Sequence, residues 1–204
     1  MRKIGLMGGT FDPIHIGHLV AAERSMEACG LDQVWFIPNA GPPLKERAPG
    51  ASPEERLRMT ELATEGHPAF RVLDLELRRG GVSYTYDTVE ELSRLEPDAE
   101  FHLIVGTDRI RDLPLWHRIG ELAQRIRFIG VDRPEDGGQP ADPALMPPLP
   151  ESLRERVIRV PMPQLDISST AIRTRLAAGL SARYLVPDAV LSHLTAKGLY
   201  RHDG

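Results

Sequence analysis

Short apolar runs alternate with segments of helical periodicity along this chain, and that alternation limits its folds more than any other feature. The apolar runs suit buried strands and span residues 3–7, 34–37, 70–73, 101–105, 127–131 and 157–160. Helical spacing, a Ser52-Pro53 capping sequence and closing glycines predict helices over residues 17–28, 52–66, 87–95, 169–178 and 187–197. Strands that alternate with helices form βαβ units, which build a parallel sheet covered by helices on both faces. We therefore predict a Rossmann-like, doubly wound α/β fold with a small C-terminal helical extension.

Length and composition are those of an ordinary globular chain. Its 204 residues are 41% hydrophobic and 26% charged, which suits one domain with a full core. We expect a single domain over residues 1–204, with the α/β core in residues 1–166 and the C-terminal helices in residues 167–204.

Charge, cysteine content and hydropathy argue against several classes of protein. A net charge of -4 at pH 7 disfavours a general nucleic-acid surface. The single cysteine, Cys29, rules out an intrachain disulfide, as in proteins of a reducing compartment. The sequence shows neither a secretory signal nor an apolar run long enough to cross a bilayer. We therefore expect a cytoplasmic protein with no membrane partner.

Polar corners follow four of the expected strands. They comprise residues 8–12, 38–39, 106–108 and 132–134. In open parallel sheets, ligands bind beyond the carboxyl ends of the strands. We expect these corners to gather at one edge of the sheet and to carry the function.

The first corner opens the stretch GGTFDPIHIGH, residues 8–18. A strand, a glycine loop and a helix in succession point backbone N–H groups at an anion, and Gly8 and Gly9 let that anion approach the backbone closely. Neither the dinucleotide fingerprint nor the P-loop sequence is present. His15 and His18 could be core residues, metal ligands or phosphate donors. The polar surroundings and the lack of a further Cys or His ligand set favour phosphate donors.

A second polar cluster occurs near the start of the helix expected at residues 169–178. Ser168, Ser169 and Thr170 together form an N-cap cluster in the first instance. With Arg173 one turn inside the helix, the same hydroxyls could also form a second anion cradle.

These two clusters jointly resemble a known family. GGTFDPIHIGH with ISSTAIR (167–173) is similar to the nucleotidyltransferase superfamily that shares an H-x-G-H motif with class I aminoacyl-tRNA synthetases. Within it, the chain resembles the bacterial nicotinate-mononucleotide adenylyltransferases. This resemblance covers nearly the whole chain and also rests on PNAGPPLK (38–45), SYTYDTVEEL (83–92), FHLIVGTD (101–108), Trp116-His117, Arg133-Pro134 and GLYR (198–201).

The resemblance implies a reaction and its substrates. Members of the family transfer AMP from ATP to nicotinate mononucleotide, release pyrophosphate and form nicotinate adenine dinucleotide, the deamido precursor of NAD. The acceptor phosphate attacks the α-phosphorus directly, so catalysis consists of positioning and charge stabilisation. Mg²⁺ would accompany ATP, held mainly by phosphate oxygens and water rather than by protein ligands.

The resemblance also implies roles for individual residues. The catalytic residues would be His18, His15 and Arg173. The ATP site would comprise these three with Gly8, Gly9, Thr10, Phe11, Gly106, Asp108, Ser168 and Ser169. The acceptor site would comprise Lys45, Ser83, Tyr84, Thr85, Trp116 and Arg133. One departure concerns Leu44, because family members often carry histidine at that place before the loop lysine.

Several alternatives stay open. Superfamily members with other acceptors share the opening motif, so nicotinamide mononucleotide remains a candidate, although Ser83, Tyr84, Thr85 and Trp116 favour nicotinate. A non-catalytic nucleotide-binding module is a second alternative. Aminoacyl-tRNA synthesis is rejected because the chain lacks a KMSKS-like loop and an evident anticodon domain. Related enzymes form dimers or larger assemblies, which leaves a homo-oligomer open.

Overall fold

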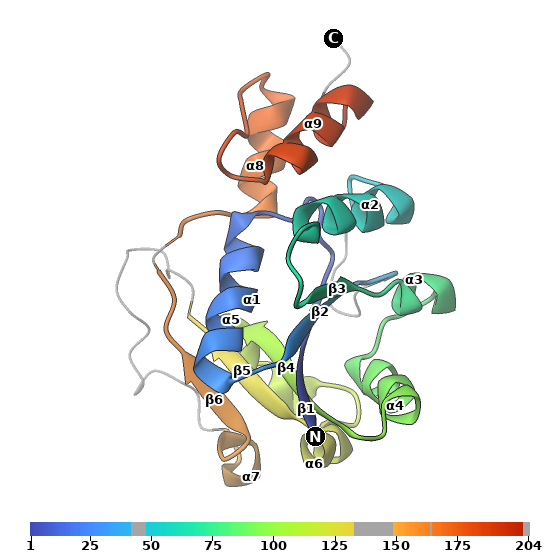
Figure 1. The fold of residues 1–204 in the computed structure, drawn as a ribbon, viewed down its shortest axis with the longest axis vertical. Helices are drawn as coiled ribbons and strands as arrows, with labels where there is room; N and C mark the ends of the chain where they lie inside the picture. The colour runs from blue at the N-terminus through green and yellow to red at the C-terminus, as the bar shows by residue number, and fades with distance from the viewer. Residues whose placement is uncertain (42–47, 133–148, 164, 202–204) are drawn as a thin grey trace. The chain divides into compact units, whose positions relative to one another are not determined.

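A computed structural model describes residues 1–41, 48–132, 149–163 and 165–201. Its strands form a six-stranded sheet in the order β3-β2-β1-β4-β5-β6. They are β1 Arg2–Gly9, β2 Gln33–Pro38, β3 Phe70–Val72, β4 Ala99–Gly106, β5 Arg127–Val131 and β6 Val157–Val160 (Figure 1). The pairs β1–β4, β4–β5 and β5–β6 are parallel. This strand order is that of a doubly wound sheet and confirms the predicted Rossmann-like α/β class.

Helices follow the strands along the chain. They are α1 Ile16–Cys29, α2 Pro53–Thr64, α3 Leu75–Arg79, α4 Thr85–Leu95, α5 Thr107–Ile110, α6 Ile119–Arg125, α7 Glu151–Arg154, α8 Ser169–Ala177 and α9 Asp188–Lys197, with a 3-10 turn at Leu113–Leu115. The long helices match the sequence predictions, and α2 begins as expected, with Pro53 in its first turn and the Ser52 hydroxyl accepting from the Glu55 N–H. The short helices α3, α5, α6 and α7 were not predicted. Each has only one or two turns, too few to produce a periodic apolar pattern.

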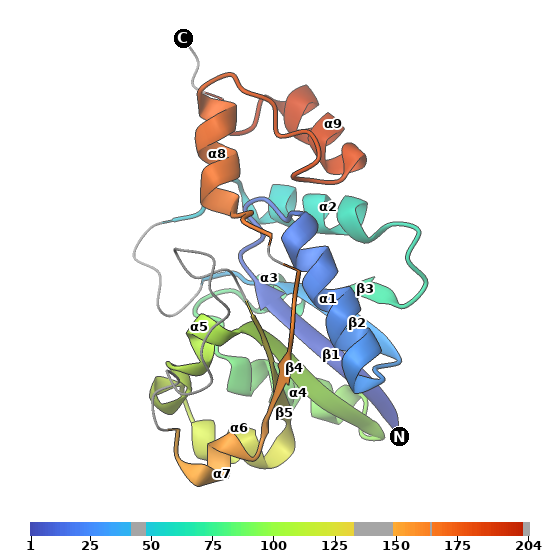
Figure 2. The same ribbon diagram turned by 90° about the vertical axis from the view of Figure 1, so that its left-hand side faces the viewer.

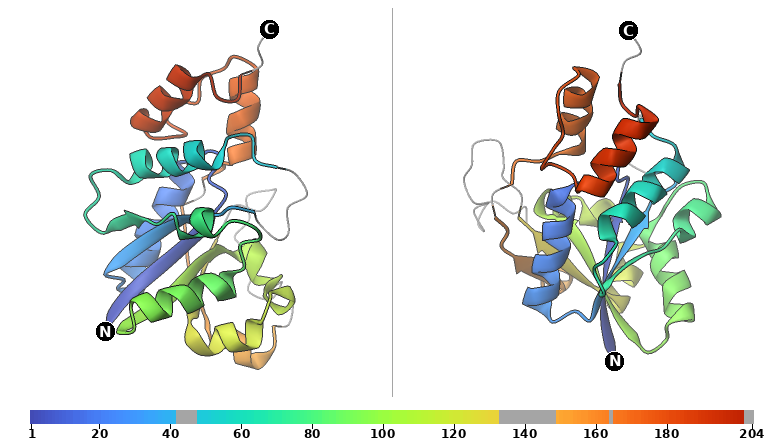
Figure 3. Two further views of the ribbon diagram at one scale, coloured as in Figure 1. Left: turned by 90° about the vertical axis from the view of Figure 1, so that its right-hand side faces the viewer. Right: turned by 45° about the horizontal axis from the view of Figure 1, so that its top comes forward.

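The chain divides into two compact units. The first comprises Met1–Gly8, Ala21–Trp35 and Tyr84–Asp166. In it β1 and β4 lie side by side (Figure 2), with Ile4 opposite Phe101 and Leu6 opposite Leu103. Gly5 of β1 is closely packed, since a Cβ there would lie 2.8 Å from Leu31 Cδ1. Helices α4 and α6 lie next to each other (Figure 3).

The second unit comprises Gly9–Val20, Phe36–Ser83 and Ile167–Gly204. Its helices α2 and α9 lie side by side (Figure 1). Glu55 of α2 pairs with His193 and with Lys197 of α9, the latter at 3.8 Å. The second unit therefore joins the segment after β1 to helices from the far end of the sequence. None of the helices in the described ranges is long and apolar enough to span a bilayer.

Candidate functional site

The segment that follows β1 turns sharply at Phe11, which has a left-handed backbone with φ of 50°. Its ring is buried and packs against Phe36 and His18, with ring centroids 6.0 and 5.2 Å apart. A Cβ on Gly9 would lie 2.8 Å from the Phe11 ring. The turn therefore requires glycine at position 9, as a close approach of backbone to side chain demands.

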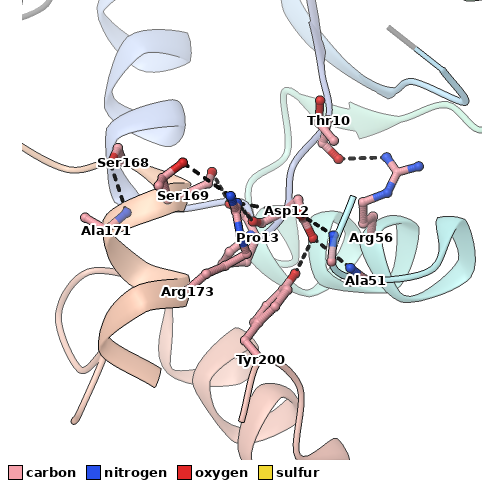
Figure 4. Close-up of polar contacts among 12 residues, drawn as sticks. Thr10, Asp12, Pro13, Ala51, Arg56, Ser168, Ser169, Ala171, Arg173 and Tyr200 are labelled. Carbon is pink, nitrogen blue, oxygen red and sulfur yellow. Dashed lines mark hydrogen bonds and ion pairs between the residues drawn. The ribbon is translucent and has the colours of Figure 1, made fainter. Parts of the chain in front are cut away.

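Asp12 is the centre of a polar cluster within the second unit (Figure 4). Its carboxylate is buried and accepts hydrogen bonds from the N–H groups of Gly50 and Ala51 at 2.8 and 3.0 Å. The Tyr200 hydroxyl donates to Asp12 Oδ1 at 2.6 Å, and Arg173 Nη1 lies 3.5 Å from Oδ2. A buried carboxylate is costly unless it is hydrogen-bonded and paired, and these four groups meet that need.

Arg173 also holds the backbone of the same turn. Its Nη1 donates to the Asp12 carbonyl at 2.7 Å, and its Nη2 donates to Thr170 Oγ1 at 3.2 Å. The Ser169 hydroxyl donates to the Pro13 carbonyl at 2.9 Å, while Ser168 accepts from the Ala171 N–H at 3.1 Å and so caps α8. The N-cap prediction for Ser168 is confirmed. The first turn of α8 is thus tied to residues 12–13 (Figure 4).

His15 and His18 lie face to face at the start of α1. Their ring centroids are 3.7 Å apart at an interplanar angle of 28°. The backbone N–H of His15 donates to His18 Nδ1 at 3.2 Å. Because Nδ1 is an acceptor, a neutral His18 carries its proton on Nε2, which makes that nitrogen a hydrogen-bond donor. His15 is buried, whereas His18 is partly exposed.

Gly9 and Thr10 each accept a hydrogen bond on their backbone carbonyl from another segment of the same unit. Arg56 of α2 is fully buried and its Nη1 donates to the Thr10 carbonyl at 2.7 Å. Burial, opposed by the nearby Asp12 carboxylate, lowers the pKa of Arg56 below the usual arginine value. The Asn39 N–H donates to the Gly9 carbonyl at 2.9 Å. Two of the expected polar corners, after β1 and after β2, therefore do meet.

The predicted adenosine residues lie in the first unit, at the end of β4. Gly106 is buried and precedes α5, and Asp108 is exposed in that helix. The Thr107 hydroxyl donates to the Val131 carbonyl at 3.4 Å, which joins the corner after β4 to the end of β5.

Three of the predicted acceptor residues also lie in the first unit. Tyr84 immediately precedes α4, in which Thr85 is the first residue. The Tyr84 ring contacts the ring of His117, with their centroids 4.6 Å apart. Trp116 is partly exposed, but its Nε1 is buried and has no hydrogen-bond acceptor among the described residues. A buried donor of this kind can serve a ligand.

The other acceptor residues are placed differently. Ser83 is buried in the second unit, where its hydroxyl accepts from the Ala40 N–H at 3.1 Å and its N–H donates to the Gly41 carbonyl. Lys45 and Arg133, like Leu44, lie outside the described residues.

The second unit thus brings together residues of the turn after β1 and of the start of α8, namely Gly9, Thr10, Phe11, His15, His18, Ser168, Ser169 and Arg173. Asp12, Arg56 and Tyr200 belong to the same cluster, although they were not among the predicted site residues. Two signals were available, because Asp12 lies inside the opening motif and Tyr200 inside GLYR. No such signal marked Arg56, which is one of two arginines in a charged helix. Within the described ranges, no three His, Cys, Asp or Glu side chains gather as a metal-binding group.

A parallel α/β sheet whose first strand is followed by a turn with histidine and arginine side chains is typical of proteins that bind phosphate-bearing ligands. Comparison with family models agrees, because residues 6–175 match the Cytidylyltransferase-like model. The chain belongs to this family.

Curated relatives cover nearly the whole chain. A Geobacillus thermodenitrificans protein named "Probable nicotinate-nucleotide adenylyltransferase" is 46% identical over 98% of this chain and 87% of its own length. A Herpetosiphon aurantiacus protein of the same name is 46% identical over 98% of this chain and 99% of its own.

The fold is also that of a solved structure. Plasmodium falciparum nicotinic acid mononucleotide adenylyltransferase, complexed with NaAD, superimposes with a TM-score of 0.76. The alignment covers 98% of both chains at 19% identity.

Proposed function

We propose that this protein transfers AMP from ATP to nicotinate mononucleotide and forms nicotinate adenine dinucleotide and pyrophosphate. The observation that carries the proposal is the attachment of Arg173 and Ser169 to the turn that also presents His15 and His18. The names of relatives 46% identical over 98% of the chain supply the substrates.

The reaction needs positioning more than covalent chemistry. A phosphate oxygen of the acceptor forms a bond to the α-phosphorus of ATP, and the bond from that phosphorus to the bridging oxygen of the β-phosphate breaks. Pyrophosphate leaves with the electron pair of that bond. The protein must therefore align the two substrates and stabilise the charge that develops on the phosphate oxygens.

In this proposal, the second unit holds the triphosphate. Thr10 and the backbone of Phe11 lie against the α-phosphate, and His18 donates from Nε2 to its oxygens, with His15 stacked behind it. Ser169 and Arg173 serve the β- and γ-phosphates, with Ser168 beside them. A guanidinium has five N–H groups, so Arg173 can bind phosphate while it keeps its bonds to Asp12 and Thr170.

Gly106 and Asp108 bind the adenosine, the glycine by close approach and the carboxylate through ribose hydroxyls. The acceptor is bound by Ser83, Tyr84, Thr85 and Trp116, with Lys45 and Arg133 near its phosphate. The indole of Trp116 offers a face for the pyridine ring.

Mg²⁺ would enter with ATP, bound through phosphate oxygens and water. When bound, it neutralises and orients the triphosphate. We also propose that the reaction takes place in the cytoplasm. The sequence contains one cysteine, which cannot form an intrachain disulfide, as in proteins of a reducing compartment.

The test is an assay with ATP, Mg²⁺ and either nicotinate or nicotinamide mononucleotide, following pyrophosphate and dinucleotide. We expect fast turnover with nicotinate and little with the amide, because a pocket built for a carboxylate leaves groups unpaired around an amide. Equal rates would indicate a dual-specificity pocket. ATP binding without turnover of either acceptor would contradict the proposal and favour another acceptor or a binding module.

A further inference from the structure

The GLYR segment, residues 198–201, has no part in the proposed reaction, yet it reaches the candidate site. Gly198 closes α9 in a left-handed conformation with φ of 63°, and Tyr200 repeats that left-handed turn. The two turns carry the Tyr200 hydroxyl to Asp12 Oδ1, at 2.6 Å, although 188 residues separate them in sequence (Figure 4).

Asp12 lies between Tyr200 and Arg173. Its Oδ1 accepts from the Tyr200 hydroxyl and the Ala51 N–H, whereas Oδ2 accepts from the Gly50 N–H and faces Arg173 Nη1 at 3.5 Å. The Tyr200 hydroxyl and the two backbone N–H groups therefore fix the plane of this carboxylate. Arg173 Nη1 also donates to the Asp12 carbonyl at 2.7 Å, so both the backbone and the carboxylate of a fixed Asp12 limit where the Arg173 guanidinium can point.

Packing supports the same connection. A Cβ on Gly50 would lie 3.1 Å from the Tyr200 ring and 3.5 Å from Arg173 Cδ, so Gly50 is in close contact with both side chains. Burial first, and the bond to Asp12 second, raise the pKa of Tyr200 well above its ordinary value. The hydroxyl therefore remains a donor throughout the physiological pH range.

We propose that Tyr200 is a positioning residue for the pyrophosphate end of ATP, acting through Asp12 on the guanidinium of Arg173. This inference rests on the proposed function for the identity of the anion, and it assigns Tyr200 no contact with substrate.

Tyr200→Phe tests the proposal directly, because it removes only the hydroxyl. A hydrogen bond to a charged group is strong enough for its loss to change affinity about 10-fold. We expect the KM for ATP to rise by about that factor, while the KM for nicotinate mononucleotide stays unchanged. Tyr184→Phe is the matched control in the same unit, since Tyr184 is 81% exposed and should leave both constants unchanged.

A double-mutant cycle with Arg173→Ala separates positioning from general destabilisation. If Tyr200 acts through Arg173, Tyr200→Phe should have little further effect on ATP affinity once Arg173 is gone. Additive effects of the two changes would overturn the proposal.

A second variant keeps the hydroxyl but displaces the ring. Gly50→Ala places a methyl group against the Tyr200 ring, and we expect it to raise the KM for ATP, as Tyr200→Phe does. It also serves in the cycle if Tyr200→Phe is not folded at the assay temperature, as thermal melting of each variant would reveal.

Direct calorimetry with pyrophosphate distinguishes the failure of this inference from the failure of the proposed function. Tyr200→Phe should bind pyrophosphate about 10-fold more weakly than the unmodified chain. Equal affinities, or no binding by the unmodified chain, would overturn the role of Tyr200. Binding of pyrophosphate without AMP transfer would refute the proposed acceptor, while the ratio of the two affinities would still decide the role of Tyr200.

Discussion

The rings of His15 and His18 stack with their centroids 3.7 Å apart, and the His15 N–H donates to Nδ1 of His18. This contact sets the tautomer of His18 and leaves its proton on Nε2. The proposed mechanism uses that proton as a donor to the α-phosphate.

His18→Ala should therefore lower kcat by about 10²–10³-fold, the usual cost of losing one donor to a developing oxyanion. The measurement is steady-state turnover with ATP and nicotinate mononucleotide, with a thermal melt to verify folding. The control is His193→Ala, which removes a histidine of α9 that pairs with Glu55 of α2 and should keep normal turnover. Near-normal turnover of His18→Ala would remove this residue from the mechanism.

Arg173→Ala should weaken ATP use more than acceptor binding, because Arg173 lies at the proposed β- and γ-phosphate position. We expect the KM for ATP to rise by at least about 10-fold. Arg175→Ala is the control, since this exposed residue of the same helix donates to the Ser181 carbonyl. A larger effect on the KM of the acceptor would mean that the two phosphate sites are exchanged.

Arg56→Met should destabilise the fold, because it leaves the Thr10 carbonyl without its 2.7 Å donor. A bond from a charged donor contributes about 1.5–3 kcal/mol, and we expect a loss of that order in the free energy of unfolding in urea. Arg58→Met in the same helix breaks only an exposed ion pair with Glu61 and should cost less than about 1 kcal/mol. Equal losses for both variants would show that the bond to Thr10 contributes little.

Gly9→Ala should also lower stability, since its methyl group would overlap the Phe11 ring at 2.8 Å. Overpacking of this kind costs about 1–3 kcal/mol. Gly8→Ala is the stability control in the same strand, because a Cβ there meets nothing within 4 Å. Thermal melting of the two variants should separate them, and a Gly9→Ala variant as stable as Gly8→Ala would contradict the tight turn.

His102 should make stability depend on pH. Its side chain is buried in β4, and burial lowers its pKa below the ordinary 6.5, against the opposing effect of Glu100. The unfolded chain therefore binds the proton more readily than the folded one. The free energy of unfolding should be constant above the ordinary pKa and fall as pH drops through 6.5 toward the lower folded value.

Urea denaturation at about pH 7.5 and about pH 5.5 measures this dependence. His102→Gln should reduce the difference between the two pH values. An unchanged difference in that variant would assign the pH dependence to other groups.

The six strands and the five long helices were predictable because each has an apolar pattern of its own. The start of α2 could also be assigned, since Ser52 and Pro53 are local signals. The helix of residues 75–79 and the one-turn helix of residues 107–110 could not, because their stability comes from packing rather than from periodicity.

The site was predictable in part for the same reason. Glycines, histidines and hydroxyls in short motifs marked the turn after β1 and the start of α8. No local pattern shows that the Tyr200 hydroxyl bonds Asp12 or that Arg56 bonds Thr10, since these partners are 188 and 46 residues apart. Contacts over such separations depend on the whole fold.

The bond between Asp12 and Tyr200 has a consequence for the order in which the protein is made. A ribosome synthesises Asp12 of the opening motif 188 residues before it reaches Tyr200. Until then the Asp12 carboxylate has no hydroxyl partner, although every proposed phosphate ligand has already been translated. A growing chain therefore carries every proposed phosphate ligand before it can hold them in their final geometry, and the site is completed only when Tyr200 has been translated.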